Sequence, residues 1–264
     1  MSHRPVDKEQ LKEALSRVDR KLVVLSGKGG VGKSTVAVNL AVGLALKGKN
    51  TGLLDTDLHG PSVPKMLGLE GFVMSGDGKH LNPALKYDGR LRVMSIQFML
   101  RNADDSIIWR GPLKHSVISQ FIGLTVWGDL DYLIIDSPPG TGDEPLSVAQ
   151  TAKPDGAVIV TTPQEVATAD VRKSMDFCRK IDLPIIGIIE NMSGFRCPHC
   201  GETTDIFGAG GARRMADDLG VPLLGSIPID PRFVSLSDKG EVLMHPEQAG
   251  ESYSAMVRII DKIL

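Results

Sequence analysis

The sequence has few cysteines and no long apolar run. Three cysteines among 264 residues are too few for the disulfide scaffold of a small secreted protein, and two of them lie in a single Cys-x-x-Cys motif. No uninterrupted apolar run approaches the roughly 18–20 residues that span a bilayer, and the N-terminus lacks the apolar core of a secretory signal. These absences predict a cytoplasmic protein with no membrane segment.

An excess of either charge is also absent. The chain carries 30 Lys and Arg against 32 Asp and Glu, which gives a formal net charge of −2. This balance argues against bulk electrostatic binding of nucleic acid. Since 42% of the residues are hydrophobic and no repeat, low-complexity tail or interdomain linker interrupts them, we expect one domain over residues 1–264.

Short apolar runs recur along the chain with helical stretches between them. They cover residues 22–25, 51–54, 91–96, 132–135, 157–160, 185–189 and 223–227. Near-continuous apolar runs are typical of strands that are buried on both faces. Their alternation with helices predicts an α/β fold with a single doubly wound, mostly parallel sheet and helices on both faces. Three stretches lie outside this alternation: a polar helix at about 7–20, an irregular or hairpin segment at 68–90, and a Gly-rich segment with two cysteines at about 193–211.

A phosphate-binding loop follows the first apolar run. Its pattern is G-x-x-x-x-G-K-[ST], in which glycines let several backbone N–H groups face a polyphosphate. A helix over residues 34–46 is expected to follow, with Gly48 as its stop, and to add the positive end of its dipole. The lysine before that helix is predicted to contact the β- and γ-phosphates, and the next serine to ligate Mg²⁺. The nucleotide-binding residues of the loop are Gly27, Lys28, Gly29, Gly30, Val31, Gly32, Lys33, Ser34 and Thr35.

The loop contains a second lysine, Lys28. A single phosphate site already served by Lys33 does not need it. Lys28 is either a solvated side chain or one that reaches the nucleotide of a facing subunit. The segment resembles the deviant Walker A motif of the MinD/ParA/nitrogenase-iron-protein group of dimerising ATPases. That resemblance implies that Lys28 is catalytic and crosses a dimer interface.

Acidic residues end two of the apolar runs. Asp55 and Asp57 follow the run at 51–54, where both carboxylates can face one phosphate–Mg²⁺ centre. We expect Asp57 to position or deprotonate the attacking water. The alternative is turn chemistry, since Gly60 and Pro61 come next. Asp136 follows the run at 132–135. This is the position of a Walker B carboxylate, which holds Mg²⁺ through a water. The Pro-Pro-Gly-Thr-Gly segment that follows is predicted to be a switch loop that senses the γ-phosphate, or a rigid turn.

The cysteine motif, Cys-Pro-His-Cys-Gly, is typical of a metal knuckle. Zn²⁺ and iron both take four ligands in such sites, and Cys197 and Cys200 supply two thiolates. Cys178 shares a helical face with Val171 and Met175, which predicts a buried core residue. Two chains related by a two-fold axis would supply four thiolates. A redox-active motif of thioredoxin type and a structural zinc between subunits are the alternatives.

Together these motifs resemble the Mrp/Nbp35 family, also called ApbC, of iron–sulfur cluster carrier proteins. The resemblance covers nearly the whole chain, and the Cys-x-x-Cys separates it from the MinD and ParA relatives. It implies a homodimer that bridges a [4Fe–4S] cluster, receives it from donors, passes it to apoproteins, and slowly hydrolyses ATP to ADP. His59 departs from the aromatic residue expected there, and the N-terminus has no extra cysteine cluster.

The resemblance also implies an adenine pocket. Asn191, after the run at 185–189, would bond the base edge with both its donor and its acceptor, and Pro228 would form the other wall. From the residues alone, each is a polar turn after a strand.

Three points stay open at this stage. Trp109 and Arg110 are either a dimer or client contact or a packed turn before a helix. A membrane-positioning or partition ATPase is a second function, for which the apolar face of residues 253–264 would be the anchor, although a helix docked on the sheet fits its few basic residues better. A metabolic enzyme that uses ATP on a small substrate is the third.

Overall fold

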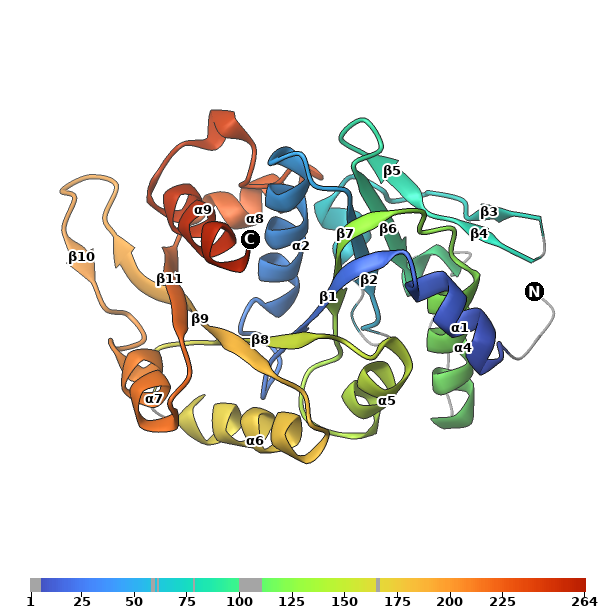
Figure 1. Cartoon of the computed structure of the whole chain (residues 1–264). Coiled ribbons are helices and arrows are strands. Elements are labelled where there is room, and N and C mark those ends of the chain that lie inside the picture. The colour runs from blue at the N-terminus through green and yellow to red at the C-terminus, as the bar shows by residue number, and fades with distance from the viewer. Residues whose placement is uncertain (1–5, 58–59, 61, 78, 100–110, 165–166) are drawn as a thin grey trace.

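The computed structural model of the chain describes residues 6–57, 60, 62–77, 79–99, 111–164 and 167–264. His59, Trp109 and Arg110 lie outside these residues. Figure 1 shows a twisted sheet with helices packed on both faces. The described helices are α1 (Lys8–Leu15), α2 (Lys33–Leu46), α3 (Val63–Met66), α4 (Gly111–Leu124), α5 (Asp143–Ala152), α6 (Ala167–Lys180), α7 (Gly211–Leu219), α8 (Arg232–Ser237) and α9 (Glu251–Ile263), with 3₁₀ turns η1 (Ile96–Met99) and η2 (Pro246–Gln248).

Seven parallel strands form the body of the sheet, and each coincides with one of the seven predicted apolar runs. They are β1 (Val18–Leu25), β2 (Thr51–Asp55), β6 (Leu91–Ser95), β7 (Leu130–Asp136), β8 (Gly156–Thr161), β9 (Ile185–Arg196) and β11 (Leu223–Ile229). The run at 91–96 extends one residue beyond β6. The predicted doubly wound, mostly parallel sheet is therefore confirmed. β2 and β8 are buried along their whole length, which is the burial expected between two helical layers.

The order of the strands decides which loops meet. The sheet runs β10-β9-β8-β1-β7-β2-β6-β5, and β11 also pairs with β9. β5 (Ala84–Lys86) and β10 (Thr203–Thr204) are antiparallel additions, and β3 (Ser75–Gly76) pairs with β4 (Leu81–Asn82) in a separate hairpin within the predicted irregular segment. Because β1 lies between β7 and β8, and β2 lies beside β7, the carboxyl ends of β1, β2 and β7 are neighbours.

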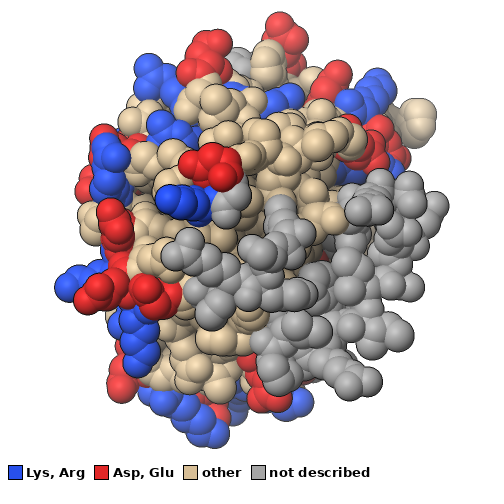
Figure 2. Space-filling model, turned by 90° about the vertical axis from the view of Figure 1, so that its right-hand side faces the viewer, with Lys and Arg blue, Asp and Glu red and all other residues tan. Residues whose placement is uncertain are grey.

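Helices cover the two faces in separate groups. α2 packs against α9 on one face, while α5, α6 and α7 lie on the other, and α1 packs on α4 (Figure 1). The main hydrophobic cluster joins the central strands to α2 and α9, and a smaller one joins β8 and β9 to α6 and α7. Figure 2 shows Lys and Arg interspersed with Asp and Glu among the described side chains on the side of α1 and α4.

The prediction of a helix over residues 7–20 is wrong at its C-terminal end. A capping box between Asp7 and Gln10 starts α1, which ends at Leu15, and β1 begins at Val18. Polar side chains at the start of β1 conceal the strand in the sequence. Arg20 donates to the carbonyl oxygen of Ile263 at 2.6 Å, and pairing with β7 overrides the local helical pattern.

The segment around the cysteines also differs from the prediction. Glu190 and Asn191 do not follow a strand but lie inside β9, which continues to Arg196. The predicted Gly-rich segment at 193–211 therefore begins with four residues of strand. Pairing with β11 as far as Phe195 supplies the hydrogen bonds that this polar stretch does not reveal in the sequence.

The C-terminal helix α9 is docked on the body of the protein. Ala255, Met256, Ile259, Ile260 and Ile263 are buried on one face, against β11 and α2. This confirms the docked-helix interpretation of residues 253–264, since the apolar face is already covered. The described helices include none with the length and apolarity needed to cross a bilayer.

Truncation of the buried face of α9 tests this packing. We expect Ile260→Ala to lower the free energy of unfolding by about 2–5 kcal/mol, because Ile260 is fully buried and its loss leaves a cavity. Arg258→Ala on the exposed side of the same helix is the control and should change it by less than about 0.5 kcal/mol. Urea denaturation measures both, and equal effects would contradict the docked position.

Candidate functional site

The phosphate loop connects the end of β1 to the start of α2. Gly32 has a φ of +81° and forms the N-cap of α2, where no side chain caps the helix. The N–H groups of the first turn are therefore left for an anion. Gly27 is required for a different reason: a Cβ there would lie 2.3 Å from the carbonyl oxygen of Asp170 on α6. The loop is built to approach a ligand closely and is itself packed against the neighbouring helix.

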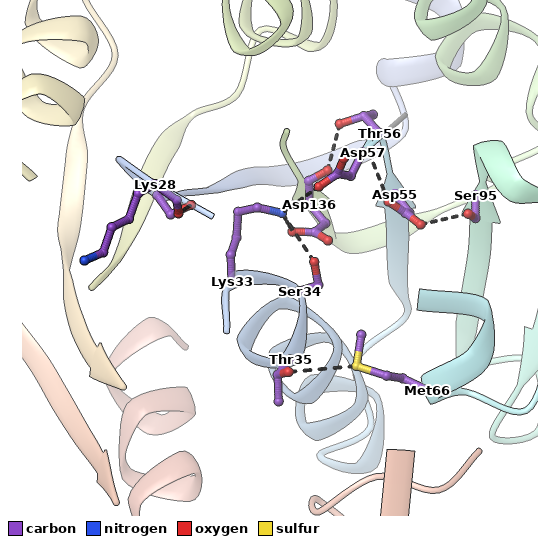
Figure 3. A network of polar contacts seen from close by, with 11 residues as sticks. Lys28, Lys33, Ser34, Thr35, Asp55, Thr56, Asp57, Met66, Ser95 and Asp136 are labelled. Atoms are coloured by element: carbon purple, nitrogen blue, oxygen red, sulfur yellow. Dashed lines mark hydrogen bonds and ion pairs between the residues drawn. The ribbon is translucent and has the colours of Figure 1, made fainter. Parts of the chain in front are cut away.

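Lys33 lies at the centre of the polar cluster shown in Figure 3. Its side chain is 6% exposed, and its Nζ lies 2.5 Å from Oδ1 of Asp136, 3.3 Å from Oγ of Ser34 and 4.0 Å from Oδ2 of Asp57. These residues come from α2, from the end of β7 and from the loop after β2. The structure thus brings together Lys33, Ser34, Asp57 and Asp136, which the sequence places up to 103 residues apart.

One carboxylate oxygen of Asp136 remains available as an acceptor. Its Oδ1 binds Lys33, but its buried Oδ2 has no hydrogen-bond partner within the described residues. Burial raises the pKa of this carboxyl above its ordinary value, and the charge of Lys33 opposes that shift. An unpartnered carboxylate oxygen beside the Ser34 hydroxyl fits a hard cation such as Mg²⁺, which prefers oxygen ligands.

Asp55 is buried beneath this cluster, whereas Asp57 is partly exposed. The sequence suggested that both carboxylates face one phosphate centre, but Asp55 accepts hydrogen bonds from Oγ of Ser95 at 2.8 Å and from the backbone N–H of Asp57 at 3.1 Å. Burial and the nearby charge of Asp136 raise the pKa of Asp55 to about 8. Asp55 therefore supports the loop that carries Asp57.

Lys28 points away from the cluster around Lys33 (Figure 3). Its Nζ donates to Oε1 of Gln164 at 3.3 Å, and its own carbonyl oxygen accepts from Oγ of Ser26. Lys28 thus belongs to the phosphate loop without serving the site that Lys33 serves. No sequence signal pointed to Gln164 as its partner.

A cavity of about 630 Å³ adjoins the phosphate loop. Asn191 and Pro228, the two predicted adenine-pocket residues, both line it, and Gly32 and Thr35 connect it to the loop. Asn191 already uses one N–H, which donates to the carbonyl oxygen of Val31 at 2.9 Å. The sequence analysis missed other lining residues because no motif marks them; these include Met192, Ile206, Phe207, Phe233 and Val234.

The cysteine knuckle, residues 197–201, is a tight turn between β9 and β10. The backbone N–H of Gly201 donates to the carbonyl oxygen of Cys197 at 2.9 Å, and the N–H of Cys197 donates to that of Glu202 at 2.8 Å. Backbone N–H groups of Cys200 and His199 lower the pKa of the Cys197 thiol, which favours the metal-binding thiolate. Within the described residues of one chain, no third His, Cys, Asp or Glu completes a metal-binding group with these thiols.

Cys178 lies in the core, as predicted. Its side chain is fully buried on α6, and burial raises the pKa of its thiol to about 12. It therefore takes no part in the knuckle.

Glu190 is a further residue that the sequence analysis missed. Its buried carboxylate accepts from Oγ of Ser193 at 2.6 Å, from Oγ of Ser226 at 3.3 Å and from the backbone N–H of Ala212 at 3.0 Å. It joins β9 to β11 and to the first turn of α7. A charged residue directly after the apolar run at 185–189 was the available signal.

Comparisons with known proteins agree on the kind of protein. A family described as ParA: NUBPL iron-transfer P-loop NTPase matches residues 17–264. A cytosolic Fe-S cluster assembly factor NUBP2 homolog of Monosiga brevicollis is 47% identical over 97% of this chain and 91% of its own length. An iron-sulfur cluster carrier protein of Methanocaldococcus jannaschii is 48% identical over 96% of this chain and 88% of its own.

Solved structures show the same similarity. A nucleotide-binding protein from Archaeoglobus fulgidus, in complex with ADP and with Co, has a TM-score of 0.82 at 43% identity over 94% of this chain and 96% of its own. The MinD cell division protein of Aquifex aeolicus has a TM-score of 0.67 at 22% identity over 92% of this chain and 96% of its own, and shares the fold.

The sheet, the phosphate loop and the acidic cluster around Lys33 define a P-loop NTPase with the MinD fold. Within that class, the chain belongs to the ParA-type family of NUBPL iron-transfer P-loop NTPases, which its match over residues 17–264 and its identity to curated relatives show.

The buried carboxylate of Asp55 predicts how stability depends on pH. Its pKa is about 8 in the folded protein and returns to the ordinary 3.8 on unfolding, so the folded state binds more protons between these values. The free energy of unfolding should then fall as the pH rises from about 4 to about 8. Asp55→Asn, which resembles the protonated form, should have a shallower decline in urea melts across this range; an identical slope in both proteins would contradict the assignment.

Proposed function

We propose that this protein is an ATP-hydrolysing carrier of [4Fe–4S] clusters that acts as a homodimer in the cytosol. The observation that carries the proposal is that one chain holds both a phosphate loop with a buried lysine and acidic cluster, and an exposed knuckle with two thiols. The family membership and the names of the curated relatives, which include cytosolic assembly factors and a cluster carrier, support it.

ATP binding would rearrange the pairing of Lys33. In this proposal Lys33 exchanges Asp136 for the β- and γ-phosphates, which the N–H groups of the loop also bind. Asp136 and the Ser34 hydroxyl would then hold Mg²⁺, a cation that would neutralise phosphate charge. Asp57 would orient the attacking water, which its partial exposure and its distance of 4.0 Å from the Nζ of Lys33 support. Lys28 would contact the nucleotide of the facing chain.

The cluster would be cargo held between two chains. A [4Fe–4S] cluster takes four cysteine thiolates, and the knuckle supplies two, Cys197 and Cys200. Two knuckles brought together by a two-fold axis complete the set. Their exposed position at the edge of the sheet suits both loading by a donor and transfer to an apoprotein. A zinc ion between the same four thiolates is the alternative occupant, and metal and sulfide analysis separates the two.

Substitutions in the acidic cluster test the nucleotide chemistry. Lys33→Ala should weaken binding of Mg·ATP by about 10–100-fold, because a charge-assisted hydrogen bond is lost. Asp57→Asn should keep most of the affinity and reduce hydrolysis by about 10²-fold or more. Calorimetry and phosphate release measure the two effects. Lys47→Ala, at the far end of α2, is the control, and wild-type hydrolysis by Asp57→Asn would overturn its role.

Removal of the thiols tests the cargo. Anaerobic reconstitution of the wild type should give about four iron and four sulfide atoms per two chains. The double variant Cys197→Ala/Cys200→Ala should lose this load and its transfer to an apo-acceptor, because no thiolate remains at the knuckle. Cys178→Ala removes the buried thiol and should retain the full load. An unchanged load in the double variant would rule out the knuckle as the cluster site.

A further inference from the structure

Strand β9 is irregular between the cavity and the cysteines. Asn191 pairs with Ile227 of β11, and the next pair is Phe195 with Ile229, so three residues of β9 bulge against one of β11. Within this bulge Met192 has a φ of +59°, a conformation that is strained for a residue with a side chain, and Gly194 has a φ of +77°. We call residues 192–194 the hinge segment. Bulges of this kind redirect a strand and occur beside functional sites.

The strand is fixed on the cavity side of the hinge segment. Asn191 binds the carbonyl oxygen of Val31, and an added Cβ at Gly32 would lie 2.2 Å from Nδ2 of Asn191. Glu190 is bound to the first turn of α7 through the N–H of Ala212. The residues before the hinge segment therefore move with the phosphate loop and with α7.

The chain beyond the hinge segment forms one unit. Phe195 and Arg196 pair with β10, Nε of Arg196 donates to the carbonyl oxygen of Gly201, and the knuckle turn is closed by its own backbone hydrogen bonds. We call residues 195–204 the knuckle hairpin. It projects at the edge of the molecule near α7 and β11 (Figure 1). Internal bonding of this kind predicts that the hairpin moves as a body about the hinge segment, and this motion has to break or carry along the pair that Phe195 forms with Ile229 of β11.

Both connections of the knuckle hairpin line the cavity. Met192 of the hinge segment enters it from the first connection, and Ile206 and Phe207 line it from the second. Ile206 is 53% exposed, so its side chain is accessible to a ligand at the cavity. A ligand in the cavity would therefore contact both connections at once.

We propose that a nucleotide in this cavity holds the knuckle hairpin against the body of the protein through Met192, Ile206 and Phe207, and so controls access to Cys197. This inference rests on the proposed function for the identity of the ligand, and it names the hinge segment as the device that regulates the cysteine site. Coupling is reciprocal. A metal that fixes the knuckle must therefore change the affinity of the protein for the nucleotide by the same factor by which the nucleotide changes its affinity for the metal.

The rate of thiol alkylation measures the coupling in the metal-free protein. We expect saturating Mg·ADP to slow iodoacetamide modification of Cys197, followed by peptide mass spectrometry, by about fivefold or more. Met192→Gly should abolish this difference, because glycine adopts the left-handed conformation without strain and leaves the hinge segment loose. Cys178, buried in α6, is an internal reference whose modification reports unfolding.

A matched substitution separates the hinge from general flexibility. Asp182 has a φ of +52° and precedes β9 at its other end, so Asp182→Gly makes the same backbone change away from the cavity and should retain the effect of Mg·ADP. An alkylation rate in the wild type that does not respond to Mg·ADP would overturn the inference. Retention of the full effect in Met192→Gly would overturn the role of the hinge segment.

The reciprocal measurement needs no variant. Zn²⁺ bound at Cys197 and Cys200 of the wild type should change the dissociation constant of Mg·ADP by the same factor by which Mg·ADP changes the dissociation constant of Zn²⁺, and an unchanged constant contradicts the coupling. Failure here is distinguishable from failure of the proposed function. A protein that loads a cluster but shows no coupling supports the proposed function and overturns the role of the hinge segment. A protein that shows coupling but loads no cluster supports the hinge segment and overturns the proposed function.

Discussion

The buried ion pair between Lys33 and Asp136 is the interaction on which the arrangement of the site depends. It joins the first residue of α2 to the end of β7, and neither side chain has more than 6% exposure. Burial of two charges is costly, and an isolated pair of this kind contributes little to stability. The unpartnered Oδ2 of Asp136 indicates that the pair serves ligand binding. This oxygen can bind a cation while Lys33 binds phosphate. Sheet order makes this possible, because β1, β7 and β2 end side by side and bring the phosphate loop, Asp136 and Asp57 to one edge.

Strand β9 connects this edge to the cysteines. Asn191 binds the phosphate loop and Cys197 follows the same strand six residues later, so the nucleotide site and the knuckle share a continuous piece of backbone. Glu190 anchors that backbone to α7, and the hinge segment interrupts it where the cavity meets the knuckle hairpin. In the proposed carrier, this path allows the state of the nucleotide to act on the thiols without a rearrangement of the core. In the same proposal, a second chain would supply the two thiolates that one chain lacks.

Much of this could be predicted from the sequence. The seven parallel strands were visible because strands covered on both faces are nearly all apolar, and Cys178 was assigned to the core from its helical face. The errors fall where tertiary pairing overrides local pattern. Charged residues conceal the start of β1 at Val18, and polar residues conceal the continuation of β9 to Arg196. The walls of the cavity, such as Phe207 and Phe233, carry no motif and become neighbours only when the chain folds.

The central claim is that each chain provides one phosphate site and half of a thiolate cage. Native mass spectrometry of the anaerobically reconstituted wild type tests it most directly, since it counts chains and clusters in the same ion. The account predicts a species of two chains that carries one [4Fe–4S] cluster, with no cluster on the single chain. A single chain that retains a whole cluster, or a pair of chains with two clusters, would contradict it.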